Sequence, residues 1–402
     1  MSFGTLALIG ACAMAGPFAS AAGRGAVPIV VGEILAGIVI GRSGFGAIDP
    51  TNPTLAFLSD IGFAMLMFNA GLQVPLREPG LRTSIGQGAA AALAVAALAV
   101  GAGWLVSRIG GVGHPAVYTV LLASSSAALA LPIIQERGLR GPATLRLIAQ
   151  VTVADVGATL AVPLVLRPGH ALHVALGSVI VAAAVIAIFV LSTRVRRLDA
   201  VQTLRHLGKQ HHWAIDLRTA LIVLFTLGWI AQRTGASLLI AGFGAGLMVA
   251  AIGGPKRLST EVLGIAGGFF IPLFFVVLGA SLNLSGLFDD PALLGLAAAL
   301  AGLNVAVHVV PVVALRRPAA AGLVASAQLG VPSAIVALGL QLHVITGAQG
   351  AAILAAALLS IAAATIGAAW LARSARGDSS GVGSLPLGSS GAVPIAGREP
   401  TS

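Results

Sequence analysis

Asp155 combines a residue type and a position that point to chemistry. It lies in the middle of the apolar run 144–166, about 12 residues or about 18 Å from the end that we expect to be cytoplasmic. A carboxylate at that depth of a membrane costs about 2.5–3.5 kcal/mol, which makes it a functional candidate. Thr152 and Thr159 lie at i−3 and i+4, on the same helix face, and Gln150 precedes them. Such oxygens suit a hard monovalent cation or a proton, whereas the alternative is an aspartate buried in hydrogen bonds to threonine or backbone.

His308 is a second ionisable side chain at membrane depth. It lies in the run 291–315, about eight residues or about 12 Å from Arg316, so its depth is comparable with that of Asp155. Histidine titrates near neutral pH and can carry a proton, but a lone histidine in an apolar helix is also a common packing residue. The sequence leaves both roles open. Other polar residues lie nearer helix ends, where water lowers their cost, and we interpret them as structural: Glu33, Asp60 and Asn69.

Two apolar runs contain small polar residues followed by proline. In the run 115–135 the cluster is Ser124–Ser126, before Pro132, and in the run 319–341 it is Ser326–Gly330, before Pro332. Both predict a helix that is broken at membrane depth, where free backbone carbonyls and half-helix dipoles can face an ion. The alternative is that the small residues only allow close helix packing. The candidate ligands from the two clusters are Ser125, Ser126 and Gln328.

The elements that must position these residues are apolar helices. Hydrophobic residues make up 57% of the 402 residues, charged residues only 9%, and the mean hydropathy is +0.99, so lipid must surround most of the chain. The net charge of +10 comes from short basic clusters between apolar runs, which excludes a nucleic-acid partner. A single cysteine, Cys12, excludes an internal disulfide and a cysteine metal cluster. No catalytic or phosphate-binding motif is present, so we expect neither an enzyme nor a cofactor.

Thirteen apolar runs are long enough to suggest transmembrane helices, and the fold class is therefore an all-α polytopic membrane protein. We expect a transmembrane domain over 1–376, with a first repeat over 4–166, a linker helix at 171–193 and a second repeat over 213–372. The Gly/Ser/Pro-rich stretch 377–402 is predicted to be a disordered cytoplasmic tail. The first run lacks a basic leader and contains Pro17, so it is interpreted as a mature span. The runs are 4–22, 27–43, 54–74, 83–108, 115–135, 144–166, 171–193, 213–231, 235–253, 260–282, 291–315, 319–341 and 348–372.

The distribution of basic residues predicts the orientation. About 17 lysines and arginines fall in the loops on one side and about 4 on the other, so the first side is cytoplasmic, with the N-terminus outside and the C-terminus inside. The longest hydrophilic connector, 193–212, falls halfway along the chain. Six helices, a linker helix and six more would place two similar halves in opposite orientations, as in inverted-repeat transporters.

A set of short segments carries a resemblance to a known family: 27–41, 61–72, 124–126, Asp155 and 269–279. In their order and spacing they resemble the monovalent cation:proton antiporter superfamily, in particular its bacterial sodium/proton and Kef-type branch. The resemblance implies a homodimer in the inner (plasma) membrane, with core and dimerisation domains, two crossing broken helices, and an aspartate that holds either a cation or a proton. Two positions depart from the family pattern, because Ala154 precedes the aspartate and His308 occupies the place of a buried lysine or arginine. We expect no counterpart of the nucleotide-binding domain of Kef-type proteins in this sequence.

These observations predict a secondary antiporter that exchanges protons for Na⁺ or K⁺, one for one and electroneutrally. Asp155 is the expected shared carrier, and the other expected ion-site residues are Gln150, Thr152, Ser125, Ser126, His308 and Gln328. An organic-anion or other solute symporter of related fold is the alternative, and it would favour a more basic pocket. A sensor or channel-like protein, without saturable exchange, is a third possibility.

Overall fold

The computed structural model of the chain describes residues 1–22, 29–74, 81–109, 113–136, 139–195, 215–252 and 264–380, and within these residues every regular element is helical. The helices of the first half are α1 (Phe3–Ala13), α2 (Ala15–Ala22), α3 (Ile29–Ile40), α4 (Pro53–Leu72), α5 (Leu81–Ile109), α6 (Pro115–Ala123), α7 (Ala127–Glu136), α8 (Pro142–Leu166), η1 (Pro168–His170) and α9 (Ala171–Val195). Those of the second half are α11 (Ile215–Thr234), α12 (Leu238–Ile252), η2 (Ala266–Phe270), α14 (Ile271–Ser281), α15 (Leu284–Asp289), α16 (Pro291–Ala314), α17 (Ala319–Ala325), α18 (Gly330–Gln341) and α19 (Gly347–Ser380).

The predicted apolar runs coincide with these helices, although some are divided. Among the described residues, nine helices or helix pairs are long and apolar enough to cross a membrane, and three shorter apolar helices accompany them. The broken pair α6 and α7 covers the remaining run. The polytopic helical fold is confirmed, whereas the count of thirteen crossings stays a prediction.

Prolines explain two departures from continuous helices. The first run divides at Met14 because Pro17 has no backbone N–H and its ring crowds the carbonyl four residues earlier. The run around 260–282 begins with a π-helical turn, η2, directly before Pro272 in the first turn of α14. A wide turn there accommodates the missing hydrogen bond.

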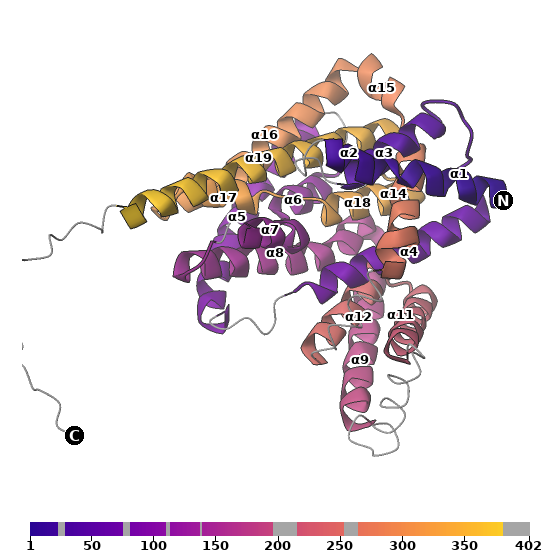
Figure 1. Ribbon diagram of the computed structural model, residues 1–402, viewed down its shortest axis with the longest axis horizontal. Coiled ribbons are helices and arrows are strands. Elements are labelled where there is room, and N and C mark those ends of the chain that lie inside the picture. The colour runs from indigo at the N-terminus through magenta and orange to yellow at the C-terminus, as the bar shows by residue number, and fades with distance from the viewer. Residues whose placement is uncertain are drawn as a thin grey trace, which may run out of the picture.

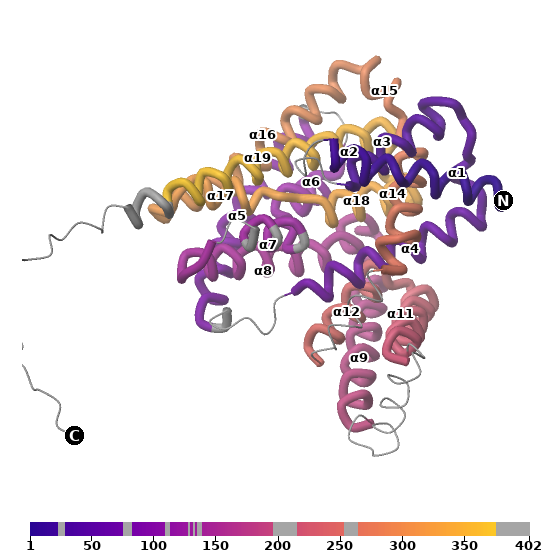
Figure 2. The backbone as a smooth tube through the Cα atoms, in the orientation of Figure 1, coloured from indigo at the N-terminus to yellow at the C-terminus, as the bar shows by residue number. Residues whose placement is uncertain are grey.

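The helices pack into two groups. The core bundle, as we name it, consists of α5–α8 and α16–α19, and the scaffold bundle consists of α1–α4, α9, α11, α12 and α14. Most packing occurs within each bundle, and the boundary between them is formed chiefly where α8 and α18 meet α4, α9 and α12. Figure 1 shows the core bundle mainly on the left and the scaffold bundle on the right and below. In Figure 2 the chain runs from α17, on the left, into α18, near the middle of the molecule.

Glycines allow the closest packing inside the scaffold bundle. A Cβ atom added at Gly246 of α12 would lie 1.9 Å from the carbonyl oxygen of Phe68, and one at Gly242 would lie 2.5 Å from that of Ala64, both on α4. The two helix backbones therefore touch directly, as small-residue interfaces permit in membranes.

Apolar side chains cover the lipid-facing surface. Along α9, Leu172, Val179, Ile186 and Leu191 are each at least 60% exposed, as expected of a helix in contact with lipid. Glu33 differs from the expectation of a hydrated helix end, because it is only 3% exposed where α3 packs on α2. The helix α19 extends to Ser380, a few residues past the expected end of the transmembrane domain, and the rest of the predicted tail lies outside the described residues.

Candidate functional site

The two broken helices meet at their breaks. The stretch Ser124–Ser126 separates α6 from α7, and the stretch Ser326–Leu329 separates α17 from α18. The hydroxyl of Ser125 donates a 2.7 Å hydrogen bond to the carbonyl of Ala325, and Gln328 Nε2 donates a 3.1 Å bond to the carbonyl of Ser124. These bonds join residues from opposite halves of the chain, so the predicted crossing of the broken helices is confirmed.

Asp155 lies at the first break, on α8. Its side chain is 6% exposed, and its Oδ2 accepts a 2.9 Å hydrogen bond from the backbone N–H of Ala127, the first residue of α7. The N-terminus of a helix carries partial positive charge and favours an anion, so this half-helix stabilises the ionised carboxylate. Oδ2 is the carboxylate oxygen that the described residues engage, which leaves Oδ1 for another partner.

Two expected site residues on α8 have buried polar atoms without a partner among the described residues. These atoms are Gln150 Nε2 and Thr152 Oγ1. Gln150 is 2% exposed, and Thr152 lies one helical turn before Asp155. An unpaired buried polar group costs roughly 1–3 kcal/mol, so the arrangement suggests a site that a ligand or water completes.

His308 joins the same break from α16 and is fully buried. Its Nδ1 lies 2.9 Å from the carbonyl oxygen of Asn304, so Nδ1 must carry the proton. Its Nε2 lies 3.3 Å from Ser125 Oγ, whose own proton is directed at Ala325. A second proton on the ring would therefore face an oxygen that can accept it. The described residues provide no hydrogen bond between His308 and Asp155.

The second break is closed by neutral groups. Gln328 donates to Asn304 Oδ1 through its side chain, and its backbone N–H donates a 3.1 Å hydrogen bond to Ser360 Oγ on α19. Asn304 Nδ2 in turn donates a 2.9 Å bond to the carbonyl of Ser326. Asn304 and Ser360 were not among the predicted site residues. Asn304 had one available signal, its position one turn before His308 on the same helix face.

Ser126 is buried at the first break, 4% exposed, and its carbonyl oxygen accepts hydrogen bonds from Leu129 and Ala130 at the start of α7. Thr159 is also buried, on the face of α8 that carries Asp155. The structure thus brings Ser125, Gln328 and His308 into one network. It places Asp155 next to that network, through Ala127, instead of within it.

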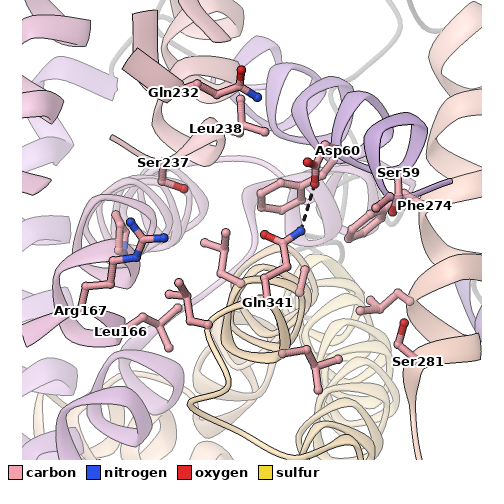
Figure 3. A pocket seen from close by; sticks show the side chains of 18 of the residues that line it. Ser59, Asp60, Leu166, Arg167, Gln232, Ser237, Leu238, Phe274, Ser281 and Gln341 are labelled. Atoms are coloured by element: carbon pink, nitrogen blue, oxygen red, sulfur yellow. Dashed lines mark hydrogen bonds between the residues drawn. The ribbon is translucent and has the colours of Figure 1, made fainter. Parts of the chain in front are cut away.

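A cavity of about 380 Å³ lies at one end of the boundary between the bundles. Figure 3 shows Leu166 and Arg167 on one side of it and Ser59, Asp60 and Phe274 on the other. Pro163 of α8 also lines the cavity, eight residues or about 12 Å along the helix from Asp155. Asp155 is not among the lining residues, so the cavity approaches the carboxylate without reaching it.

Comparison with known proteins gives a consistent picture. The transmembrane sodium/hydrogen exchanger family matches residues 6–374. YjbQ of Bacillus subtilis strain 168, provisionally assigned as a Na(+)/H(+) antiporter, is 26% identical over 358 residues, which cover 83% of this chain and 58% of YjbQ. The glutathione-regulated potassium-efflux system protein KefC of Enterobacter sp. strain 638 is 27% identical over 301 residues, covering 71% of this chain and 46% of KefC. The chain therefore spans about half the length of these curated relatives.

A solved structure shares the fold. The sodium proton antiporter MjNhaP1 from Methanocaldococcus jannaschii, at pH 8, matches with a TM-score of 0.60 at 15% sequence identity. The match covers 91% of this chain and 96% of that structure.

Proposed function

This chain belongs to the transmembrane sodium/hydrogen exchanger family, and from that premise we propose that it is a secondary antiporter exchanging protons for Na⁺ or K⁺. Its relatives include a provisionally assigned Na(+)/H(+) antiporter and a potassium-efflux protein, which supports this class of cargo. We add no cofactor, because side-chain oxygens can bind both ions.

The observation that carries the proposal is the placement of Asp155. Its carboxylate caps the N-terminus of α7 through Ala127 while the hydroxyl of Thr152 lies unpaired nearby on the same helix. A carboxylate can hold a proton or a cation but not both at once, so the binding of one releases the other. The groups that we assign to complete the cation site are the hydroxyl of Thr152 and the side-chain carbonyl oxygen of Gln150 on α8, with Ser125 and Ser126 from the break between α6 and α7.

Alternating access follows from the two bundles. The carboxylate lies on the core bundle, and the cavity lies between the core and scaffold bundles at one end of their boundary. Movement of the core bundle against the scaffold bundle would close this route and open one at the other end, as in other inverted-repeat transporters. One carboxylate for each cargo ion gives one-for-one, electroneutral exchange.

His308 and Gln328 tie the two breaks together, and His308 can take a second proton that faces Ser125. We assign His308 as a group that lowers cation occupancy when it is charged, through repulsion of like charges. The asymmetry of basic loops orients the protein with its N-terminus outside and its C-terminus in the cytoplasm of a plasma membrane. Several of those arginines lie outside the described residues. The family resemblance supports a homodimer formed through the scaffold bundle.

The test is exchange by the purified protein in liposomes that contain a pH-sensitive dye. Na⁺, K⁺ and Li⁺ are added in turn, with and without valinomycin to clamp the membrane potential. We expect saturable proton movement that is insensitive to the clamp and that Asp155→Asn abolishes. Asp289→Asn, the same change at an exposed aspartate, should leave it intact. Exchange that persists in Asp155→Asn would overturn the assignment of Asp155, and clamp-dependent exchange would overturn electroneutrality.

A further inference from the structure

Asp60 and Gln341 form a side-chain hydrogen bond between the two bundles. Asp60 lies in the second turn of α4, in the scaffold bundle, and Gln341 is the last residue of α18, in the core bundle. Gln341 Nε2 donates to Asp60 Oδ1 over 3.0 Å, although the residues are 281 positions apart in the sequence. Figure 3 shows this bond crossing the cavity.

The surroundings of the bond make it distinctive. Asp60 is the only acidic residue among those that line the cavity in the described part of the chain, and Arg167 is the only arginine. The other residues that α4 and α18 contribute to the cavity wall are mostly apolar, among them Phe63 and Leu338. Apolar side chains can slide past one another. A directional hydrogen bond cannot slide, because it weakens steeply when donor and acceptor separate or turn.

We propose that Asp60 and Gln341 are positioning residues for exchange, whose hydrogen bond holds the core bundle against the scaffold bundle in the conformation with this cavity open. This inference rests on the proposed function, since movement of the core bundle must break the bond in each cycle. It also changes our interpretation of Asp60, which the sequence suggested was only structural.

The first test measures the cavity directly and needs no transport. Cys12 is replaced by serine, and Ala236, a half-buried cavity-lining residue, by cysteine. The purified protein is then labelled with an uncharged maleimide. In this background Asp60→Ala and Gln341→Met each remove the bond. Each should slow labelling by about threefold to tenfold, the population change expected from losing one hydrogen bond.

A conservative variant provides the matched control. Asn at position 60 keeps an oxygen that can accept from Gln341, so Asp60→Asn should label within about twofold of the parent. The double variant Asp60→Ala/Gln341→Met should be no slower than either single variant, because both remove the same bond. Thermal unfolding and size-exclusion profiles of all variants confirm that they are folded.

Two outcomes would overturn the proposal. Equal labelling in every variant would show that the bond does not hold the cavity open. The second outcome is a labelling rate that falls equally in Asp60→Asn and Asp60→Ala and stays at the parent value in Gln341→Met. It would show that the charge of Asp60 acts alone, for example by attracting cations. Failure of the proposed function gives a different result: the wild-type protein shows no exchange in liposomes while the labelling pattern still follows the bond.

Discussion

At each break a backbone N–H donates to a side chain of the following helix, but the acceptors differ in chemistry. In the first, the N–H of Ala127, the first residue of α7, donates to Asp155 on α8. In the second, the N–H of Gln328, two residues before α18, donates to Ser360 on α19. The difference is that a carboxylate can change its charge and a serine hydroxyl cannot.

The polar residues around Asp155 and around Ser360 also differ in how completely they are hydrogen-bonded. Among the described residues, Gln150 and Thr152 on the helix of Asp155 have buried polar atoms without a partner, whereas Asn304, Ser326 and Gln328 near Ser360 bond to one another. In the same part of the chain, the hydroxyl of Ser333 on α18 also has no partner. Under the proposed function, the first break holds an ion and the second contributes stability.

The largest expected effect comes from making the first break resemble the second. Asp155→Ser places a hydroxyl at the first break, the group that Ser360 provides at the second, and removes the charge. We expect exchange to fall below detection in the liposome assay, while the thermal unfolding temperature stays close to that of the wild type because no buried charge remains to be desolvated. Substantial exchange by this variant would show that the charge at the first break is dispensable.

The next effect concerns cation affinity. Thr152→Val removes an unpaired oxygen beside Asp155 without removing a hydrogen bond among the described residues. We expect the apparent KM for the cation to rise about tenfold, equivalent to about 1.4 kcal/mol, with little change in stability. Thr365→Val on α19, whose hydroxyl donates to the carbonyl of Ile361, is the matched control and should leave KM unchanged. An unchanged KM in Thr152→Val would remove that residue from the cation site.

The smallest effect on transport is expected at the second break. Ser360→Ala removes the acceptor of the buried Gln328 N–H and should destabilise the protein by about 1–3 kcal/mol. Exchange, measured below the unfolding temperature, should stay within about threefold of the wild type. A loss of exchange without a loss of stability would mean that both breaks take part in transport.

Residues whose presence in an apolar helix costs much free energy could be recognised from the sequence. A carboxylate inside an apolar run is costly enough to identify Asp155. Clusters of small polar residues before Pro132 and Pro332 identify both breaks. Ser360 was not identified, because a serine in an apolar helix costs little and can bond its own backbone, as Ser360 does to Ala357.

Contacts between residues far apart in the sequence could not be predicted, because they depend on how the helices pack. The bond between Asp60 and Gln341 depends on how the two bundles dock, and neither residue is unusual within its own helix. The π-helical turn before Pro272 similarly depends on local backbone adjustment that composition does not reveal. The presence of an apolar helix and the positions of its charged residues are local properties of the sequence. Hydrogen bonds between side chains of different helices are properties of the assembled fold.

The glycine contacts between α4 and α12 have a mechanical consequence. At Gly242 and Gly246 the backbone of α12 lies directly against the backbone of α4, so these two positions leave no room for a side chain to rearrange. We therefore expect the scaffold bundle to be rigid where α4 packs on α12. The movement that the proposed function requires, which exposes Asp155 to alternate sides, must then take place elsewhere in the molecule. The boundary between the two bundles beside α18, which has fewer contacts than the interior of either bundle, is where we expect that movement.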